Sequence, residues 1–366
     1  MKLKSFMISA CMIICMLHTN NSYAQGCVAV RGSGGASCSL TGTSDSTGWL
    51  LNVNNRYFKS YKHFVGTKEQ HERTENGTEV INHTFNMDIL VQRQLNPSWA
   101  IAIIIPMISN ARSSLYEHGG NSAGPGARHT THSFGLGDVR FIALKWLRDP
   151  VAASRWNVQA GFGIKLPTGD YRYQDYFHRN DSLQVLGPVD QSIQLGDGGT
   201  GISAELNAFY RFTERISAYA NVFYLVNPRE QNGVSTARGG VPTAAQLAYG
   251  SNVMSVPDQY MLRAGFNVAM NRFSFSAGVR KECIPVTDLI GGSNGFRRPG
   301  YIVTIEPGLT FQMKQLTWYA LLPVALERNR TQSVPDRIRT QKTGVYAHGD
   351  AAFADYALNI GALIRF

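Results

Sequence analysis

One recurring pattern constrains the fold of this sequence more than any other feature. Segments of about ten residues alternate an apolar side chain with a small or polar one. Residues 355–366 show the pattern most clearly, with the uninterrupted apolar set Tyr356, Leu358, Ile360, Ala362, Ile364 and Phe366. Because successive side chains of a β-strand point to opposite faces, this segment predicts a strand with one face suited to hydrocarbon.

The pattern recurs along the chain from Trp49 onward. Twelve segments carry it: 49–61, 85–95, 99–109, 134–147, 156–167, 201–212, 216–226, 258–268, 273–283, 301–311, 316–329 and 355–366. Five of the connections are short turns, and they alternate with six long loops near 66–82, 110–133, 168–199, 227–257, 285–300 and 331–352. Roughly ten residues of tilted strand span a bilayer, and alternating turns and loops are typical of transmembrane β-barrels.

We therefore predict an all-β fold, a transmembrane antiparallel up-and-down β-barrel of about 12 strands over residues 48–366. The short turns are expected at the periplasmic end and the long loops at the extracellular end. An even strand number places both ends of the barrel on the periplasmic side, and closure removes the unpaired sheet edges. A soluble exported β-sandwich is the alternative fold.

The aromatic residues favour the barrel. In the predicted strands the tryptophans all fall at the periplasmic ends, where an interfacial ring can place its apolar body and its polar N–H in different surroundings. In the core of a soluble sandwich, tryptophans would have no reason to gather at one end of the strands. The predicted periplasmic girdle is Trp49, Trp99, Trp146, Trp156, Trp318 and Phe366.

Residues 1–24 have the organisation of an export signal peptide. A basic start precedes an apolar run of eleven residues, and Ser22 and Ala24 fit the small-residue rule for cleavage before Gln25. The run is too short for a membrane helix, which needs about 20 apolar residues. Lipid attachment at Cys27 is the alternative, although "AQGC" lacks the usual aliphatic residue three places before the cysteine.

Residues 25–47 are expected to form a periplasmic or lumen segment ahead of the barrel. Cys27 and Cys38 bracket a Gly/Ser-rich stretch and, in an oxidising compartment, are expected to form a disulfide. Cys283 is then unpaired, and we interpret it as a small apolar side chain near a strand end.

The positive charge of the sequence does not predict nucleic-acid binding. Lys and Arg number 35 against 25 Asp and Glu, yet the basic residues neither gather on a helix nor interleave with a stacking motif. Basic loops facing anionic lipid explain the excess better.

Several strings in the loops and rims resemble a known family. They are "HFVG", "EVINHTF", "HTTHSFGLGDVRF", "KLPTGDY", "PVDQSIQLGDGGTG", "SVPDQY", "DLIGGSNGFRRPGY" and "GDAAFADY". Together they resemble the outer-membrane barrels of the family named for the MetA pathway of phenol degradation, over nearly all of the mature chain. This resemblance implies a transporter-like barrel and the uptake of aromatic compounds, but it transfers no binding residue.

The predicted lumen face carries charges of both signs. Such side chains avoid lipid, because an Arg or Lys at the bilayer midplane costs roughly 2–4 kcal/mol. They predict either a permeation path or a network of mutually paired ions that closes the interior. The candidates are Asp88, Arg140, Lys165, Glu205, Arg263, Arg280, Glu306, Glu327 and Asp355.

Two patterns in the sequence could indicate an enzyme. "GGSNG", with Ser293 at its centre, matches a nucleophile motif but lacks the strand and helix that the motif needs on either side. His83 and Ser109 share outward parity near the outer ends of adjacent strands, where a phospholipase would place its base and nucleophile. No third residue orients the histidine, so we predict no catalytic residue and no enzyme.

Four histidines in the long loops, His118, His129, His132 and His348, could converge on the outer face, with Glu117 and Asp350 beside two of them. Their spacing matches no recognised ligand set, so we predict no metal and no cofactor.

The sequence thus predicts a channel or facilitator for passive uptake of small aromatic or amphipathic solutes across the outer membrane of a Gram-negative bacterium. A lipid hydrolase using His83 and Ser109 and a non-conducting structural barrel are the alternatives. The expected partners are outer-membrane lipid and lipopolysaccharide, the barrel-insertion machinery and an unidentified small solute, with no nucleic acid.

Overall fold

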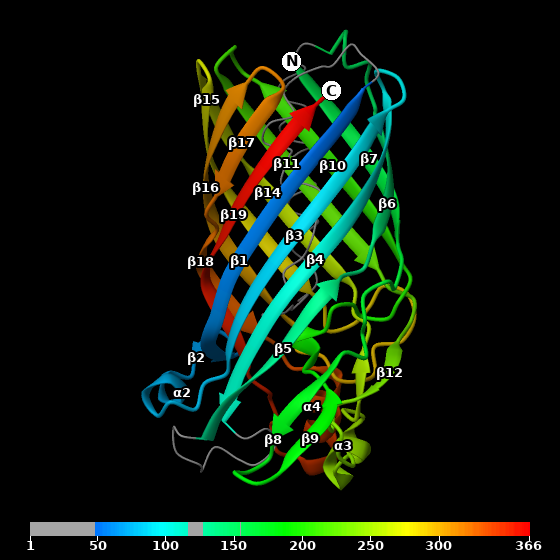
Figure 1. Cartoon of the computed structure of the whole chain (residues 1–366), viewed down its shortest axis with the longest axis vertical. Coiled ribbons are helices and arrows are strands. Elements are labelled where there is room, and N and C mark those ends of the chain that lie inside the picture. The colour runs from blue at the N-terminus through cyan, green and yellow to red at the C-terminus, as the bar shows by residue number, and fades with distance from the viewer. Residues whose placement is uncertain (1–47, 116–126, 154) are drawn as a thin grey trace.

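The computed structural model describes residues 48–115, 127–153 and 155–366, which form a closed antiparallel β-barrel (Figure 1). Its wall consists of twelve strands, two of which are interrupted; we call each of the twelve a stave. This number confirms the predicted fold. Ten staves are single strands: β1 (Trp49–Val65), β3 (Ile81–Gln94), β4 (Trp99–Leu115), β7 (Trp156–Lys165), β10 (Gly201–Arg211), β11 (Ile216–Val226), β14 (Gln259–Met270), β15 (Phe273–Ile284), β16 (Gly300–Met313) and β19 (Ala351–Arg365). Two staves are interrupted: β5 (Arg128–Leu136) continues as β6 (Arg140–Trp146), and β17 (Leu316–Leu321) continues as β18 (Val324–Arg330).

Pairing between the first and last strands closes the wall. The register of β1 against β19 runs from Leu50↔Arg365 to Phe64↔Ala351. The C-terminus therefore lies at the end of the barrel that carries the short turns (Figure 1). We name this end periplasmic and the opposite end extracellular, following the usual arrangement of such barrels.

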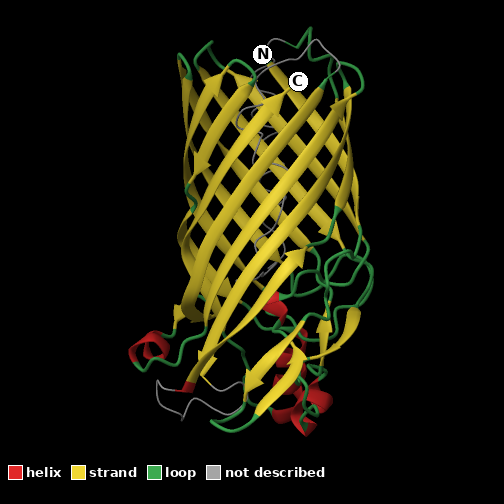
Figure 2. Ribbon diagram, viewed as in Figure 1, coloured by secondary structure: helices red, strands yellow, loops and turns green. Residues whose placement is uncertain are grey.

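The remaining elements gather at the extracellular end (Figure 2). They are β2 (Lys68–Glu69), α2 (His71–Glu75), β8 (Gln174–His178), β9 (Gln184–Pro188), the 3-10 turn Gln191–Ile193, β12 (Gln231–Ser235), α3 (Ala244–Tyr249), β13 (Val253–Ser255) and α4 (Val334–Thr343). The longest helix, α4, begins at a capping box of Ser333 and Asp336 and ends at Gly344, whose φ of 70° suits glycine. Among the described residues, no helix has the length and apolar character required to span a membrane.

The outer face of the wall is an apolar belt. Alternate residues along each strand are exposed and apolar, as the sequence pattern predicts. Representative members, all more than 40% exposed, are Ile101, Phe141, Phe162, Leu206, Val222, Leu262, Val279, Ile305 and Ile360. Since water would hydrate this belt at a high cost in free energy, its natural surroundings are hydrocarbon.

The inner face is filled on one side by apolar side chains. Leu50, Leu90, Ala100, Ala102, Ile104, Ile142, Leu144 and Leu363 form one buried cluster there. Nearby, the ring of Tyr319 lies over Gly361, where an added Cβ would be 2.2 Å from the ring. The Tyr319 hydroxyl lies 3.0 and 3.2 Å from the side-chain oxygens of Asn52 and Asn54.

The periplasmic rim carries most of the predicted aromatic girdle. Trp49, Trp99, Trp156, Trp318 and Phe366 are 42–65% exposed. Cations cover three of the indoles: Arg93 lies over Trp49, Lys145 over Trp99 and Arg148 over Trp156.

The girdle prediction was wrong for Trp146. In β6 the even-numbered residues face the lumen, beginning with Arg140, and Trp146 follows that parity. Its ring packs edge-on against Phe209, with 6.0 Å between the ring centroids. It therefore lies at the expected height but inside the barrel mouth.

Candidate functional site

A chain of buried ion pairs crosses the lumen between side chains of four strands. Arg56 on β1 donates two hydrogen bonds to Glu282 on β15, of 3.0 and 2.9 Å. Arg280 donates to the same Glu282 at 2.7 Å and to Glu306 on β16 at 3.3 Å. Arg263 on β14 donates its Nε–H to Glu306 at 2.5 Å. We call these five buried residues the lumen network.

Strand register explains how the lumen network forms. Arg263 and Arg280 lie directly opposite each other on neighbouring strands, and Glu306 pairs with Gly278, two positions from Arg280. Two adjacent guanidinium groups repel, and the carboxylate that both contact offsets this repulsion. Around the wall, β1 and β15 are separated by β19, by β17 with β18, and by β16. The Arg56 side chain therefore contacts Glu282 through the interior of the barrel and not along the sheet.

The charges of the lumen network are close to balanced. It contains three arginines and two glutamates, and Asp88 on β3 interacts electrostatically with Arg56. Buried charges are stable only when paired, and removing one partner leaves the other uncompensated. Each member therefore depends on its neighbours.

A cavity of about 130 Å³ lies on the extracellular side of the lumen network; we call it the lumen chamber. Its walls are strand residues slightly nearer the loops than the network, and residues 191–197 cover it. Its lining mixes apolar with polar side chains, among them Phe58, Ile108, Leu195, Phe223, Ile284, Asn86, Asn110, Asp138, Arg140, Lys165 and Asp197.

Two cations on opposite strands shape one side of the lumen chamber. Arg140 pairs in register with Lys165. The Arg140 guanidinium lies over the Phe223 ring, 5.4 Å from its centroid. Lys165 forms an ion pair with Asp197 and lies 3.6 Å from Asp138. Because Asp197 belongs to the loop after β9, this ion pair fixes the loop against β7.

The loop residues 189–197, together with residues 227–258 and 285–299, form what we call the roof. Asp190 is its centre: the carboxylate is 1% exposed and accepts two hydrogen bonds from Arg298, of 2.7 and 2.8 Å. Arg238 also donates to it, and Arg112 on β4 lies 3.7 Å away. Burial alone would raise the pKa of Asp190, but the positive charges of Arg112, Arg298 and Arg238 outweigh it and hold that pKa well below its ordinary value.

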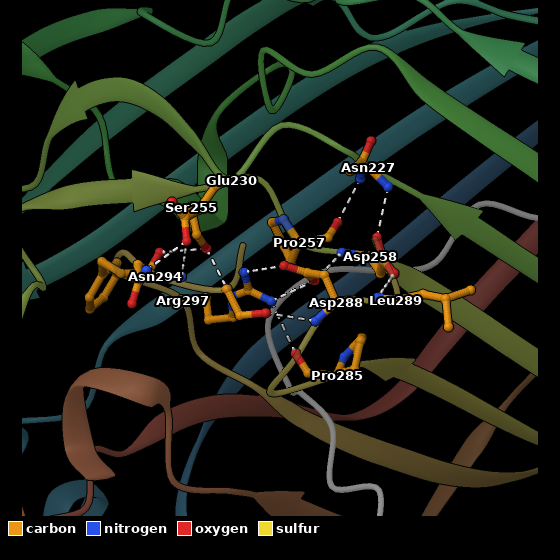
Figure 3. Close-up of polar contacts among 12 residues, drawn as sticks. Asn227, Glu230, Ser255, Pro257, Asp258, Pro285, Asp288, Leu289, Asn294 and Arg297 are labelled. Atoms are coloured by element: carbon orange, nitrogen blue, oxygen red, sulfur yellow. Dashed lines mark hydrogen bonds and ion pairs between the residues drawn. The ribbon is translucent and has the colours of Figure 1, made fainter. Parts of the chain in front are cut away.

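A second set of polar contacts joins two parts of the roof (Figure 3). Arg297 donates two hydrogen bonds to Asp288, of 2.7 and 2.6 Å, and one to the Ser255 hydroxyl at 3.0 Å. The backbone N–H of Asp258 donates to Asp288, and that of Leu289 donates to Asp258. The loop that ends at Asp258 and the loop that follows β15 are therefore held as one unit.

Further hydrogen bonds join parts of the roof to one another and to the wall. The Gln191 side chain donates to the carbonyls of Ser255 and Phe296, at 3.0 and 3.1 Å. Asn110 on β4 and Ser133 on β5 both donate to the carbonyl of Ile193. The roof is thus anchored to β4 and β5 at the extracellular end of the barrel.

Seven of the nine predicted lumen residues have lumen-facing positions. They are Asp88, Arg140, Lys165, Glu205, Arg263, Arg280 and Glu306. The structure brings three of them, Arg263, Arg280 and Glu306, into direct contact. Their role in permeation stays a prediction.

The predicted position of Glu327 was wrong. Val303 pairs with Glu327 and Thr304 with Ala325, so Leu326 is an extra residue that shifts the alternation of β18. Glu327 is exposed and accepts a hydrogen bond from Tyr301, an outward residue of β16.

Asp355 also leaves the strict alternation. Phe58 pairs with Ala357 and Ser60 with Ala354, so Asp355 lies in a bulge where two residues of β19 oppose one residue of β1. It is partly exposed and contacts Lys62 and Arg328, outside the lumen network.

The geometry does not assemble the hydrolase that His83 and Ser109 would require. Both side chains are exposed, but Ser109 pairs in register with Phe85, and His83 pairs with Ala111. His83 Nδ1 lies 2.8 Å from the Tyr57 hydroxyl. Among the hydrogen bonds of residues 48–115, none joins His83 to Ser109, as a base and its nucleophile require.

Other predictions fall partly outside the described residues. The signal peptide, the segment 25–47, the Cys27–Cys38 disulfide, Glu117 and His118 lie there. Within the described ranges, no group of three or more His, Cys, Asp or Glu side chains is placed to hold a metal ion. Cys283 is a buried free thiol.

Sequence reasoning missed two essential contributors. Arg56 was not among the candidates, although it follows the inward parity of Leu50 and Asn52 along β1 and so was detectable. Asp190 lies in a long loop, where no periodicity indicates which residues meet. Only the folded loops bring it to Arg112, Arg238 and Arg298.

The overall fold is similar to that of solved outer-membrane barrels. An outer membrane channel from Pseudomonas putida F1 matches with a TM-score of 0.58 and 10% identity, over 92% of this chain and 100% of that chain. The NalP autotransporter translocator domain from Neisseria meningitidis matches with a TM-score of 0.45 and 13% identity, over 88% and 89%. The CymD monoaromatic hydrocarbon channel matches with a TM-score of 0.41 and 9% identity, over 94% of each chain.

The first similarity and the apolar belt agree on the fold and its location. A closed barrel of this kind resides in the outer membrane of a Gram-negative bacterium. No protein-family model and no curated protein matches the sequence. Membership of the family named for the MetA pathway therefore stays a prediction.

Proposed function

We propose that this barrel is an outer-membrane channel or facilitator for passive uptake of small amphipathic or aromatic solutes. The lumen chamber carries the proposal, because it combines apolar and polar side chains inside the wall. Sites for small molecules typically have this mixed lining, in which a few polar groups orient the ligand. The Pseudomonas putida barrel of similar fold is described as an outer membrane channel.

The lumen network is the proposed selective step. Its ion pairs cross the bore between the chamber and the periplasmic end, so a solute passes only when some of them separate or rearrange. Charges in a low-dielectric wall act strongly on a passing ion. The roof is the proposed extracellular barrier above the chamber.

Single-channel recording in planar bilayers tests the proposal. We expect the wild-type protein to conduct, and Arg140→Gln and Arg263→Gln to shift ion preference toward cations. Lys68→Gln, an exposed residue of β2, is the matched control, because salt screens its charge over about 8 Å. Unchanged selectivity in both lumen variants, with a change in the control, would place the path elsewhere.

A non-conducting structural barrel is the second candidate. The observation that favours it is the lumen network itself, since ion pairs that join separate parts of the wall also brace it. Absence of conductance and of liposome swelling in both the wild type and the lumen variants would establish this function in place of transport.

The finer assignments belong to the same proposal. We infer uptake of aromatic compounds from the family resemblance, and contacts with lipopolysaccharide and the barrel-insertion machinery from the fold. A phospholipid hydrolysis assay with and without calcium tests the hydrolase alternative, for which hydrolysis abolished by His83→Ala would be decisive.

A further inference from the structure

Two basic residues face each other on the lipid side of the wall. Lys59 on β1 pairs in register with His83 on β3, and both side chains are exposed. Odd-numbered residues of β1 from Trp49 to Lys59 point outward, while their even-numbered neighbours face the lumen. Lys59 and His83 therefore project from the outside of the barrel.

Along the barrel axis, Lys59 and His83 lie at the level of the outer headgroup region. Lys59 follows the periplasmic girdle residue Trp49 by ten positions. At about 3.3 Å per residue and a tilt of about 40°, this distance spans roughly 25 Å, the height of the apolar band of such barrels. Tyr57, one step nearer the hydrocarbon, has the interfacial position expected of an aromatic residue.

The charge of Lys59 is not matched by a protein carboxylate. Its ammonium lies 4.8 Å from the centre of the Tyr61 ring. Within the described part of the chain, no ion pair links Lys59 or His83 to an acid. The acid in the bulge opposite Lys59, Asp355, accepts a hydrogen bond from Tyr61 and is engaged by Lys62 at 3.1 Å and by Arg328 at 2.5 Å.

His83 is oriented for a further contact. Its Nδ1 is 2.8 Å from the Tyr57 hydroxyl, so this hydrogen bond fixes the ring plane and leaves Nε2 for a ligand. Tyr57 also stacks on the imidazole, with 6.2 Å between the ring centroids. An ammonium group and an imidazole nitrogen on adjacent strands can together bind a phosphate oxygen cluster.

We propose that Lys59 and His83 bind a phosphate of an outer-leaflet glycolipid, a phosphomonoester on the lipid A disaccharide. The phosphate supplies a negative charge to Lys59 and His83, because the carboxylate opposite Lys59, Asp355, is engaged by Lys62 and Arg328, and the neighbouring tyrosine rings contact the sugar and acyl chains. The site lies on the outside of the wall and does not rest on the proposed channel function.

A second outward lysine, Lys281, provides a matched control. Lys281 on β15 lies over the Tyr301 ring at 4.4 Å, much as Lys59 lies over Tyr61. Lys281 pairs in register with Val303, which in turn pairs with Glu327, so this row already contains a carboxylate. Each tyrosine also donates to a carboxylate, Tyr61 to Asp355 and Tyr301 to Glu327. Asp355 forms ion pairs with Lys62 and Arg328, whereas Glu327 forms none within the described residues, so the two lysines differ in how far the nearby carboxylate is already neutralised.

Native mass spectrometry of the full-length protein in detergent tests the site, with titration of lipid A bearing both phosphates, dephosphorylated lipid A and phosphatidylglycerol. We expect Lys59→Gln and His83→Gln each to weaken binding of phosphorylated lipid A by roughly tenfold. Lys281→Gln should change it by less than about twofold. A heat-shift gel confirms that each variant is a folded barrel.

Three results would overturn the site. They are equal wild-type binding of dephosphorylated and phosphorylated lipid A, equal binding of phosphatidylglycerol, and a loss in Lys281→Gln as large as that in Lys59→Gln. The first result would show that the phosphate is not recognised. The second would show only general attraction of anionic lipid, and the third would show that Lys59 binds no better than Lys281. Conductance of the same variants is a separate readout of the channel.

Discussion

The lumen network and the roof both bury arginines against carboxylates, but different backbones hold them. In the lumen network, strand register places Arg263, Arg280 and Glu306 before any ion pair forms. In the roof, the ion pairs of Asp190 and Arg297 themselves hold loops of little regular structure. Loss of an ion pair should therefore destabilise the wall without displacing its strands. In the roof, the same loss should release the loops.

Glu306→Gln should have the largest effect on the wall. The carboxylate is 0% exposed and serves both Arg263 and Arg280, so its loss leaves two buried cations without their shared partner. We expect the free energy of unfolding in detergent to fall by about 3–5 kcal/mol, measured by urea titration of tryptophan fluorescence. Adding Arg263→Gln should restore part of this loss. A double variant as unstable as the sum of the single variants would show that the residues are not coupled.

Asp190→Asn should loosen the roof with little effect on the wall. Its loss leaves Arg238 and Arg298 without their charged acceptor, and we expect local opening of the roof to become easier by about 2–3 kcal/mol. Hydrogen exchange at the Ser192 amide, which donates to Asp190, measures this change. Glu214→Gln at an exposed periplasmic turn is the control. Equal loss of global stability in Asp190→Asn would erase the distinction between the two regions.

Acid should loosen the roof. Burial raises the pKa of Asp190, but the positive charges of Arg112, Arg298 and Arg238 outweigh it and hold that pKa below its ordinary value. Such groups contribute stability that is complete above the unfolded-state pKa of about 3.9 and is lost as pH falls through the folded-state pKa. Protease cleavage of the roof should therefore increase below about pH 4. Each unit by which folding lowers the carboxyl pKa corresponds to ~1.4 kcal/mol of stability, which is lost when the carboxylate is protonated. Asp190→Asn should reduce this response, and an unchanged response would contradict the role of Asp190.

Tyr319→Phe should have the smallest effect. It keeps the ring over Gly361 and removes only a neutral hydroxyl that lies near Asn52 and Asn54. We expect a loss of about 1 kcal/mol in unfolding free energy, measured by the same urea titration. A loss as large as that of Glu306→Gln would show that charge is not what distinguishes the lumen network.

The two regions also differ in what the sequence could predict. Side-chain parity predicted the twelve staves and the lumen-facing positions of Arg263, Arg280 and Glu306, because wall geometry repeats every two residues. It failed for Glu327 and Asp355, since a bulge adds one residue and reverses the parity beyond it. The roof was beyond prediction, because contacts between long loops depend on the folded path and not on local pattern.

The seam between β1 and β19 has a consequence for how the barrel folds. Leu50 pairs with Arg365, so this seam joins strands more than 300 positions apart, whereas neighbouring strands such as β14 and β15 are joined by a short turn. Ordering a chain segment of that length costs more conformational entropy than closing a hairpin, and contacts distant in sequence form slowly. The hairpins should therefore form first and the seam last, so the rate of barrel closure depends on how soon β19 meets β1.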